Sequence, residues 1–225
     1  MLLNQRAVRD NIRNRNGKRV FYLGKGDQLT SEARDFLQRE RIEILPAETA
    51  KPERYRLLTG GFCEEKPEHM THLHGDILVP KTHPRIAFRG AVDSLEAELL
   101  WCALGLSGYR KELEEILALA RRLIRCDVLG EPVPEQPLCG LTLSEIRSHS
   151  HRPQDFYGKP HFMPEVSDGE TVLGLNRVRA AARYAELTAA AAFQDENGLC
   201  TRTDILQALN RISSMLYILM IKAKP

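Results

Sequence analysis

Residues 176–186 read NRVRAAARYAE, with alanines in the interior and no glycine or proline, a composition that favours an α-helix. Arg179, Arg183 and Glu186 are spaced i, i+4 and i+7, so at 3.6 residues per turn they lie on one face of that helix. Two cations and a carboxylate on one stripe are suited to holding a polyphosphate and its metal ion. The alternative is a solvated helix face with an internal Arg–Glu pair.

The composition is that of an ordinary globular protein. The chain has 225 residues, 43% of them hydrophobic, which is enough for one large domain or for a domain with an appendage. The net charge of +2 does not indicate a nucleic-acid partner. The longest apolar run, residues 215–221, is far too short to cross a bilayer. Five scattered cysteines without a CxxC pair, and no signal peptide, predict reduced thiols in a cytoplasmic protein.

The N-terminal part predicts a small α+β appendage. Residues 1–19 carry six basic side chains against one acid, which indicates either a frayed terminal arm or a docking peptide for a partner surface. Residues 20–23 and 41–45 read as short strands on either side of a helix that Thr30 or Ser31 caps. The glycine-rich loop before that helix has backbone N–H groups suited to phosphate, although it lacks the P-loop pattern.

Residues 46–84 are rich in proline and poor in periodic apolar positions, so a loop-rich region is expected. This region contains residue types that ligate metal ions: Cys63, His69, His72, His74 and His83. Their spacing fits no standard zinc pattern, and only one cysteine is present, so we expect no tightly bound transition metal. A metal-dependent hydrolase remains an alternative function, built on His69, His72, His74 and Asp76.

After Pro84 the apolar positions recur with the helical period. They predict helices at about residues 85–106, 110–127, 144–149, 171–193 and 204–222, with an aromatic-containing loop at residues 150–169. The last helix is apolar nearly all round at its end, which predicts central burial or a subunit interface. The expected fold is mostly α. It is an up-and-down helical bundle of about five helices at residues 85–225, preceded by the basic arm at 1–19 and the small α+β region at 20–84.

Five motifs stand out along the chain: KP…THL at 66–73, PR…FR at 84–89, VDSL at 92–95, RCDVLGEP at 125–132 and DILQALNRISS at 204–214. They resemble the ethanolamine-utilisation cobalamin adenosyltransferases, and the resemblance covers roughly residues 20–222. The last motif is highly specific. The arginine stripe and LNRIS at 209–213 also resemble the wider propanediol-utilisation type of ATP:cob(I)alamin adenosyltransferase.

The resemblance implies an activity and an assembly. That family transfers the 5′-deoxyadenosyl group of ATP to the cobalt of cob(I)alamin, giving adenosylcobalamin and triphosphate. It uses ATP, Mg²⁺ and cobalamin, and the helical bundle assembles as a homotrimer with both substrates between subunits. For this chain the resemblance implies a supply of adenosylcobalamin to ethanolamine ammonia-lyase. It also implies contacts with a reductase and a bacterial microcompartment, and no contact with nucleic acid or a membrane.

The resemblance assigns the nucleotide site to two regions. Arg183 and Asn210 match the family's ATP contacts, which act together with bound Mg²⁺. Glu186 matches a residue that orients the nucleotide or the metal of its phosphates. A looser match makes the N-terminal loop a nucleotide loop through Lys25, Gly26, Asp27 and Thr30.

The resemblance also assigns residues to the corrinoid. Phe162 matches an apolar wedge that removes the lower axial ligand of cobalt, which makes Co(II) easier to reduce to Co(I). Asp93 matches an acid that pairs with the arginine at Arg179, within a chain or across a subunit boundary, and fixes the corrinoid pocket.

The chain also departs from its relatives. Some ethanolamine-type members carry a histidine followed by a CCxxC cluster for a divalent metal, where this chain has only Cys63. Ser214 stands where the wider type has aspartate. A second alternative function is a non-catalytic corrinoid carrier, which would hand the cofactor to a lyase and would bind cobalamin without needing ATP.

Overall fold

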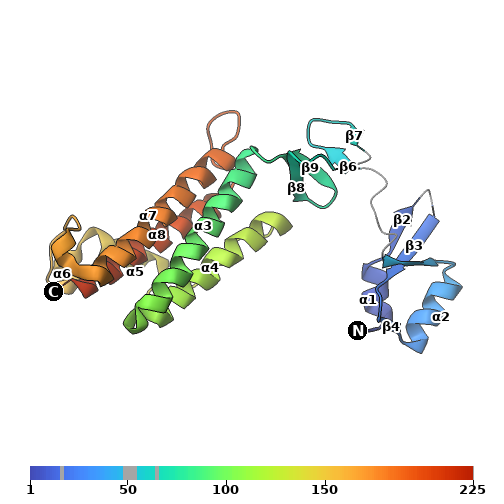
Figure 1. Ribbon diagram of the computed structural model, residues 1–225, viewed down its shortest axis with the longest axis horizontal. Coiled ribbons are helices and arrows are strands. Elements are labelled where there is room, and N and C mark those ends of the chain that lie inside the picture. The colour runs from blue at the N-terminus through green and yellow to red at the C-terminus, as the bar shows by residue number, and fades with distance from the viewer. Residues whose placement is uncertain (16–17, 48–54, 64–65, 225) are drawn as a thin grey trace. The chain divides into compact units, whose positions relative to one another are not determined.

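The computed structural model describes residues 1–15, 18–47, 55–63 and 66–224 (Figure 1). By its internal contacts the chain divides into two compact units. The first comprises Met1–Tyr55 with Phe62–Glu65, and the second comprises Arg56–Gly61 with Lys66–Pro225. Among the described helices, none combines the length and the hydropathy that crossing a bilayer requires.

The first unit is a small α+β fold, drawn mainly in blue in Figure 1. Its helices are α1 (Gln5–Asp10) and α2 (Ser31–Arg39), and its strands are β1 (Leu2–Leu3), β2 (Arg13–Arg15), β3 (Lys18–Leu23), β4 (Gln28–Leu29), β5 (Glu43–Pro46) and β7 (Phe62–Cys63). β3 pairs antiparallel with β2 and parallel with β5, and β1 pairs parallel with β4. Of the two predicted caps, Thr30 is the one that caps α2, because its Oγ1 accepts the N–H of Ala33 at 3.3 Å.

The first fifteen residues are folded rather than frayed. β1 pairs with β4, and Val8 of α1 is fully buried in the small core that Phe21, Phe36 and Leu37 build. Two-residue strands and a six-residue helix are too short to give a readable period, so the sequence indicated a frayed arm. The pairing and the burial correct that expectation, whereas the docking peptide stays a prediction.

Residues 55–80, where mostly loop was expected, contain a small sheet in the second unit. β9 (Ile77–Pro80) lies between β6 (Tyr55–Leu57) and β8 (Met70–His74), parallel to β6 and antiparallel to β8. Gly75 makes the turn between β8 and β9 with a positive φ of 53°, a conformation that favours glycine. Strands this short show too few alternations to be recognised from sequence.

The rest of the second unit is helical, which confirms the mostly α class. Its helices are α3 (Pro84–Gly105), α4 (Arg110–Leu129), α5 (Leu143–His151), α6 (Pro153–Tyr157), α7 (Gly169–Ala192) and α8 (Thr203–Ala223), with 3-10 turns η2 (Ser107–Tyr109) and η3 (Val166–Asp168). The five predicted helices correspond to α3, α4, α5, α7 and α8. The short helix α6 lies where only loop was expected, because Pro153 starts it and Gly158 ends it within five residues.

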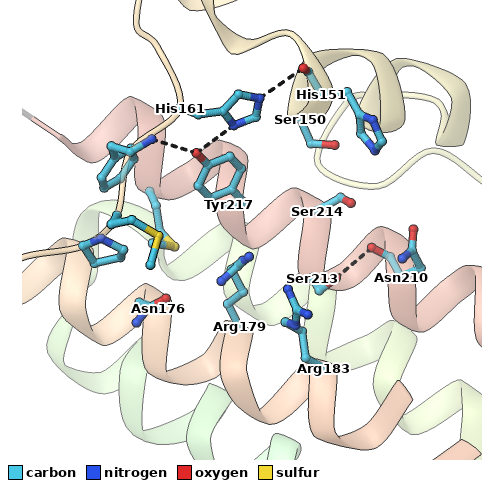
Figure 2. A pocket seen from close by; sticks show the side chains of 14 residues that line it. Ser150, His151, His161, Asn176, Arg179, Arg183, Asn210, Ser213, Ser214 and Tyr217 are labelled. Carbon is cyan, nitrogen blue, oxygen red and sulfur yellow. Dashed lines mark hydrogen bonds between the residues drawn. The ribbon is translucent and has the colours of Figure 1, made fainter. Parts of the chain in front are cut away.

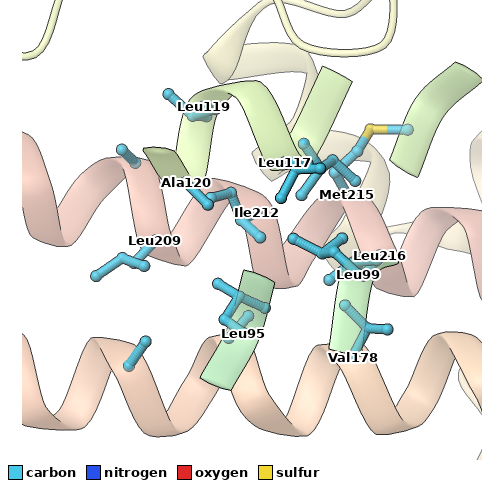
Figure 3. Packing of buried hydrophobic residues seen from close by; sticks show 14 of the residues in the cluster. Leu95, Leu99, Leu117, Leu119, Ala120, Val178, Leu209, Ile212, Met215 and Leu216 are labelled. Atoms are coloured by element: carbon cyan, nitrogen blue, oxygen red, sulfur yellow. The ribbon is translucent and has the colours of Figure 1, made fainter. Parts of the chain in front are cut away.

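α8 is the central helix of this unit. It packs against α7, α5 and α4, and α3 packs against α7 and α4 (Figure 1). Figure 3 shows Ile212 and Leu216 of α8 among Leu95 and Leu99 of α3 and Val178 of α7, all fully buried. The central burial predicted for the last helix is confirmed. Apolar side chains at helical spacing on four helices therefore hold the unit together, because each contributes to one continuous core.

A buried ion network joins α3 to α4 and to β8. Asp127 of α4 has no exposed side-chain surface and accepts from Arg85 at 2.6 Å and from Arg89 at 2.7 Å. Arg89 also donates to the carbonyl of Leu73 at 2.8 Å, which fastens the sheet to the helices. The PR…FR and RCDVLGEP motifs thus contribute structural arginines and their carboxylate.

Candidate active site

A cavity of about 890 Å³ opens on α7 and α8 of the helical unit (Figure 2). Its walls come from the end of α5, the loop at residues 161–164, α7 and α8. The residues that line it are Ser150, His151, His161, Phe162, Met163, Pro164, Asn176, Arg179, Arg183, Asn210, Ser213, Ser214, Tyr217 and Met220. Four of the sequence-predicted site residues, Phe162, Arg179, Arg183 and Asn210, therefore lie around one cavity.

One wall of the cavity is cationic. Arg179 and Arg183 are one turn apart on α7, and Figure 2 shows both side chains rising toward α8. Burial lowers the pKa of Arg179, and the neighbouring charge of Arg183 lowers it further. Within the described part of the chain, neither arginine forms an ion pair with a carboxylate. Two cations without a counter-ion at a cavity wall form a site suited to a polyanion.

Glu186 lies beside this wall and is not free. Its Oε1 accepts from Nδ2 of Asn210 at 3.0 Å, so the carboxylate orients that amide. The Oδ1 of Asn210 in turn accepts from Arg211, whose guanidinium is buried and whose pKa burial lowers. The internal Arg–Glu pair of α7, which was the alternative for this helix face, is not formed among the described residues, since Glu186 binds α8 instead.

The opposite wall is apolar and consists of the loop that carries Phe162. Phe162 is half-buried, and the next residue, Met163, is 84% exposed. The ring of Phe162 stacks on Tyr217 with centroids 5.9 Å apart, and Nζ of Lys224 lies 4.2 Å from the centroid of the Phe162 ring. Asp168 holds that ammonium at 2.9 Å. The loop is thus fixed from two sides.

Tyr217 is a site residue that the sequence reasoning missed. Its hydroxyl contacts the backbone N–H of Phe162 at 3.2 Å and Nδ1 of His161 at 3.1 Å. Its ring lies under the guanidinium of Arg179, 5.3 Å from ring centroid to Cζ. The available signal was its position seven residues after Asn210, which places a polar-tipped ring on the same face of α8.

Two predicted groups are not among the residues that line this cavity. Asp93 is exposed on α3 and forms no ion pair among the described residues of this single chain, so its pairing with Arg179 stays a prediction for a subunit boundary. The glycine-rich loop belongs to the first unit. There Asp27 accepts from the N-terminal ammonium at 2.8 Å, and Thr30 serves as the cap of α2.

The histidine-rich segment forms no metal centre in the described part of the chain, where no three His, Cys, Asp or Glu side chains converge. His72 and His74 are both exposed on β8, and Asp76 is bound by Arg56 through two hydrogen bonds of 2.9 Å. The ligand set that the hydrolase alternative requires is therefore not assembled among these residues.

Comparison with known proteins identifies similar sequences. A family described as cobalamin adenosyltransferase matches residues 62–223. The chain is 32% identical to the corrinoid adenosyltransferase EutT of Salmonella typhimurium strain LT2, over 89% of this chain and 84% of that protein. It is 31% identical, with the same coverage, to the corrinoid adenosyltransferase EutT of Escherichia coli strain K12. No solved structure matches the chain with significance.

Proposed function

Because the chain belongs to the cobalamin adenosyltransferase family, we propose that its α7–α8 cavity transfers the 5′-deoxyadenosyl group of ATP to the cobalt of a reduced corrinoid. The observation that supports this site is that one wall of the cavity is cationic and the other is apolar. Arg179 and Arg183, without a carboxylate partner among the described residues, form one wall, and the apolar loop of Phe162 forms the other. A polyphosphate fits the first wall, and the flat apolar face of a corrin fits the second.

The reaction needs no nucleophile from the protein. The electron pair of Co(I) attacks C5′ of ATP, a Co–C bond forms, the C5′–O bond breaks and its electron pair leaves with triphosphate. We propose that Arg179 and Arg183 neutralise the departing triphosphate while Asn210, oriented by Glu186, positions the nucleotide. Fixed cations stabilise such a leaving group because they need not reorganise when its charge develops.

Mg²⁺ prefers carboxylate and phosphate oxygens. Among the described residues that line the cavity, none is a carboxylate, and Glu186 borders it only through Asn210. We therefore propose that Mg²⁺ is held chiefly by the triphosphate of ATP, with Glu186 as the carboxylate that would reach it. The glycine-rich loop of the first unit remains a proposed nucleotide contact through Lys25 and its neighbours.

We further propose that a homotrimer completes the site. The face of α3 that carries Asp93 also exposes Leu100, Trp101 and Leu104, with Trp101 67% exposed. Large apolar side chains at helical spacing on one face are typical of a surface that another chain covers. An up-and-down bundle packed in this way would let Asp93 of one copy bind one edge of the Arg179 guanidinium in a neighbouring copy. The remaining N–H donors of that guanidinium would then face the phosphates. The EutT relatives support a role in ethanolamine utilisation. Residence in a microcompartment and a reductase as partner are further proposals, which follow from the family resemblance alone.

Phe162 provides the sharpest test of the proposed corrinoid wall. As a wedge it excludes the lower axial ligand, which eases reduction of Co(II) but is not needed once Co(I) is present. Phe162→Ala should therefore lose most activity when cob(II)alamin and a reduced flavin are supplied. It should keep far more when chemically prepared cob(I)alamin is supplied. The formation of adenosylcobalamin is followed by its absorption spectrum in both assays.

The control is the melting temperature of the same variant. A purely packing role for Phe162 predicts a loss of stability, up to about 3–5 kcal/mol for a buried phenylalanine, and equal activity losses in the two assays. That result would remove the wedge from the proposal while leaving the arginine wall in place.

A further inference from the structure

Tyr217 is where three parts of the cavity meet. Its hydroxyl contacts the backbone N–H of Phe162 and the imidazole of His161, and its ring contacts Arg179. Figure 2 shows the side chain standing between the loop and the arginines of α7. Among the described residues, no second hydrogen-bond partner holds the N–H of Phe162. The Tyr217 hydroxyl therefore holds the backbone N–H of Phe162, while Lys224 contacts the ring of Phe162 from the other side.

The directions of these hydrogen bonds follow from the chemistry of the groups. Nε2 of His161 lies 3.1 Å from the carbonyl oxygen of His151, which can only accept, so Nε2 carries the proton. In a neutral ring Nδ1 is then an acceptor, and the hydroxyl of Tyr217 donates to it. The oxygen of Tyr217 keeps lone pairs for the N–H of Phe162. Each donor in this series of hydrogen bonds therefore has an acceptor. The hydroxyl of Tyr217 links the imidazole of His161 to the backbone of Phe162.

The ring of Tyr217 has a separate role. The guanidinium of Arg179 lies over it at 5.3 Å, and burial, chiefly, lowers the pKa of this arginine. A cation over an aromatic face is attracted to it without being neutralised. The ring thus orients Arg179 while leaving its charge available to an anion in the cavity.

We propose that Tyr217 is a positioning residue that ties the Phe162 wedge to the cationic wall. Its hydroxyl sets the position of Phe162 beneath the corrin, and its ring sets the position of Arg179 beside the phosphates. This inference rests on the proposed function of Phe162. It assigns the two tasks to different atoms of one side chain, so that two substitutions can separate them.

The test compares Tyr217→Phe and Tyr217→Leu with Phe162→Ala, and uses Tyr109→Phe as a control that removes a tyrosine hydroxyl outside the cavity. Tyr217→Phe keeps the ring and loses the hydroxyl. Its rate from cob(II)alamin with reduced flavin should fall about tenfold, with little change when cob(I)alamin is supplied. The electron paramagnetic resonance signal of four-coordinate Co(II), recorded with ATP present, should fall in parallel.

Tyr217→Leu removes the ring as well. It should show the same cob(II)alamin defect and, in addition, a KM for ATP raised about three- to tenfold in both assays. Tyr109→Phe should match the unchanged protein in all readouts.

The outcomes separate this inference from the function on which it rests. If Phe162→Ala is selective for cob(II)alamin and Tyr217→Phe is not, Tyr217 does not position the wedge. Equal losses for Tyr217→Phe in both assays, together with a lower melting temperature, would show packing alone and would also overturn it. If Phe162→Ala shows no selectivity, the wedge itself fails and this inference fails with it.

Discussion

Two sets of arginines in the helical unit contrast sharply. Arg85 and Arg89 surround Asp127, whose side chain is fully buried, with N–O distances of 2.6 and 2.7 Å. Arg179 and Arg183 lie at the cavity wall, and among the described residues no carboxylate pairs with either. Both sets come from helices and both belong to motifs that resemble the family, yet among the described residues only the first set contacts a carboxylate.

The contrast separates structural from functional cations. A buried carboxylate with two guanidinium partners keeps its stabilising effect only while all members remain, because each isolated charge is costly in the interior. Cations left unpaired at a cavity instead favour an anionic ligand, at a cost in stability of the free protein. We therefore expect substitutions in the first set to change unfolding and substitutions in the second to change binding.

The largest expected effect on stability is that of Asp127→Asn. The amide keeps the shape of the side chain but removes the charge that Arg85 and Arg89 share. The variant should be destabilised by about 3–5 kcal/mol, because two guanidinium groups remain partly buried without their counter-ion. Urea-induced unfolding measures the loss.

Glu96→Gln is the matched control, because Glu96 forms the exposed ion pair with Arg121 at 2.9 Å. Its cost should be no more than about 1 kcal/mol. A similar small cost for both variants would contradict the structural role given to the buried network.

A smaller effect is expected from Asp204, which forms a separate ion pair with Arg202 at 2.8 Å. The pKa of Asp204 is lowered from 3.8 to about 2, chiefly because Arg202 donates to it, and the N–H of Val133 adds to the effect. A carboxyl with a lowered folded-state pKa stabilises the fold above its unfolded value and loses that contribution as the pH falls through the folded value. The contribution is about 2 kcal/mol and disappears between about pH 4 and pH 2.

Asp204→Asn tests this linkage. The variant should lose that stability at neutral pH, and its stability should depend less on pH between about 4 and 2 than that of the unchanged protein. Unfolding curves across this range provide the comparison. Parallel pH profiles for the two proteins would show that the Arg202–Asp204 pair contributes nothing on folding.

The helices could be predicted closely from sequence, because apolar positions at a period of 3.6 persist over about twenty residues. The helix expected at residues 110–127 is Arg110–Leu129, and that expected at 204–222 is Thr203–Ala223. The strands could not be predicted as well. β1 has two residues and β6 three, and β4, which pairs with β1, and β9, which pairs with β6, lie more than twenty positions away along the chain. Pairing over such distances leaves no local period to read.

The candidate site could likewise be predicted only in part from the sequence. The spacing on α7 placed Arg179 and Arg183 on one face, and the family resemblance added Asn210 and Phe162, which line the same cavity. Tyr217 was missed because its role depends on a loop 55 residues earlier in the chain. The counter-ion of Arg85 and Arg89 was missed for the same reason, since nothing in a sequence motif tells a paired arginine from an unpaired one.

The most direct test of the contrast is ATP binding by two variants of α7. Arg183→Gln removes an arginine that has no carboxylate partner among the described residues. Arg177→Gln removes a neighbour on the same helix that is paired with Glu98 at 2.7 Å. Isothermal titration with Mg²⁺ and ATP should show Arg183→Gln weakened about ten- to a hundredfold, as expected for a lost charge-assisted contact to phosphate, and Arg177→Gln unchanged. Unaltered affinity in Arg183→Gln, or an equal loss in both variants, would contradict the assignment of the unpaired arginines to the triphosphate.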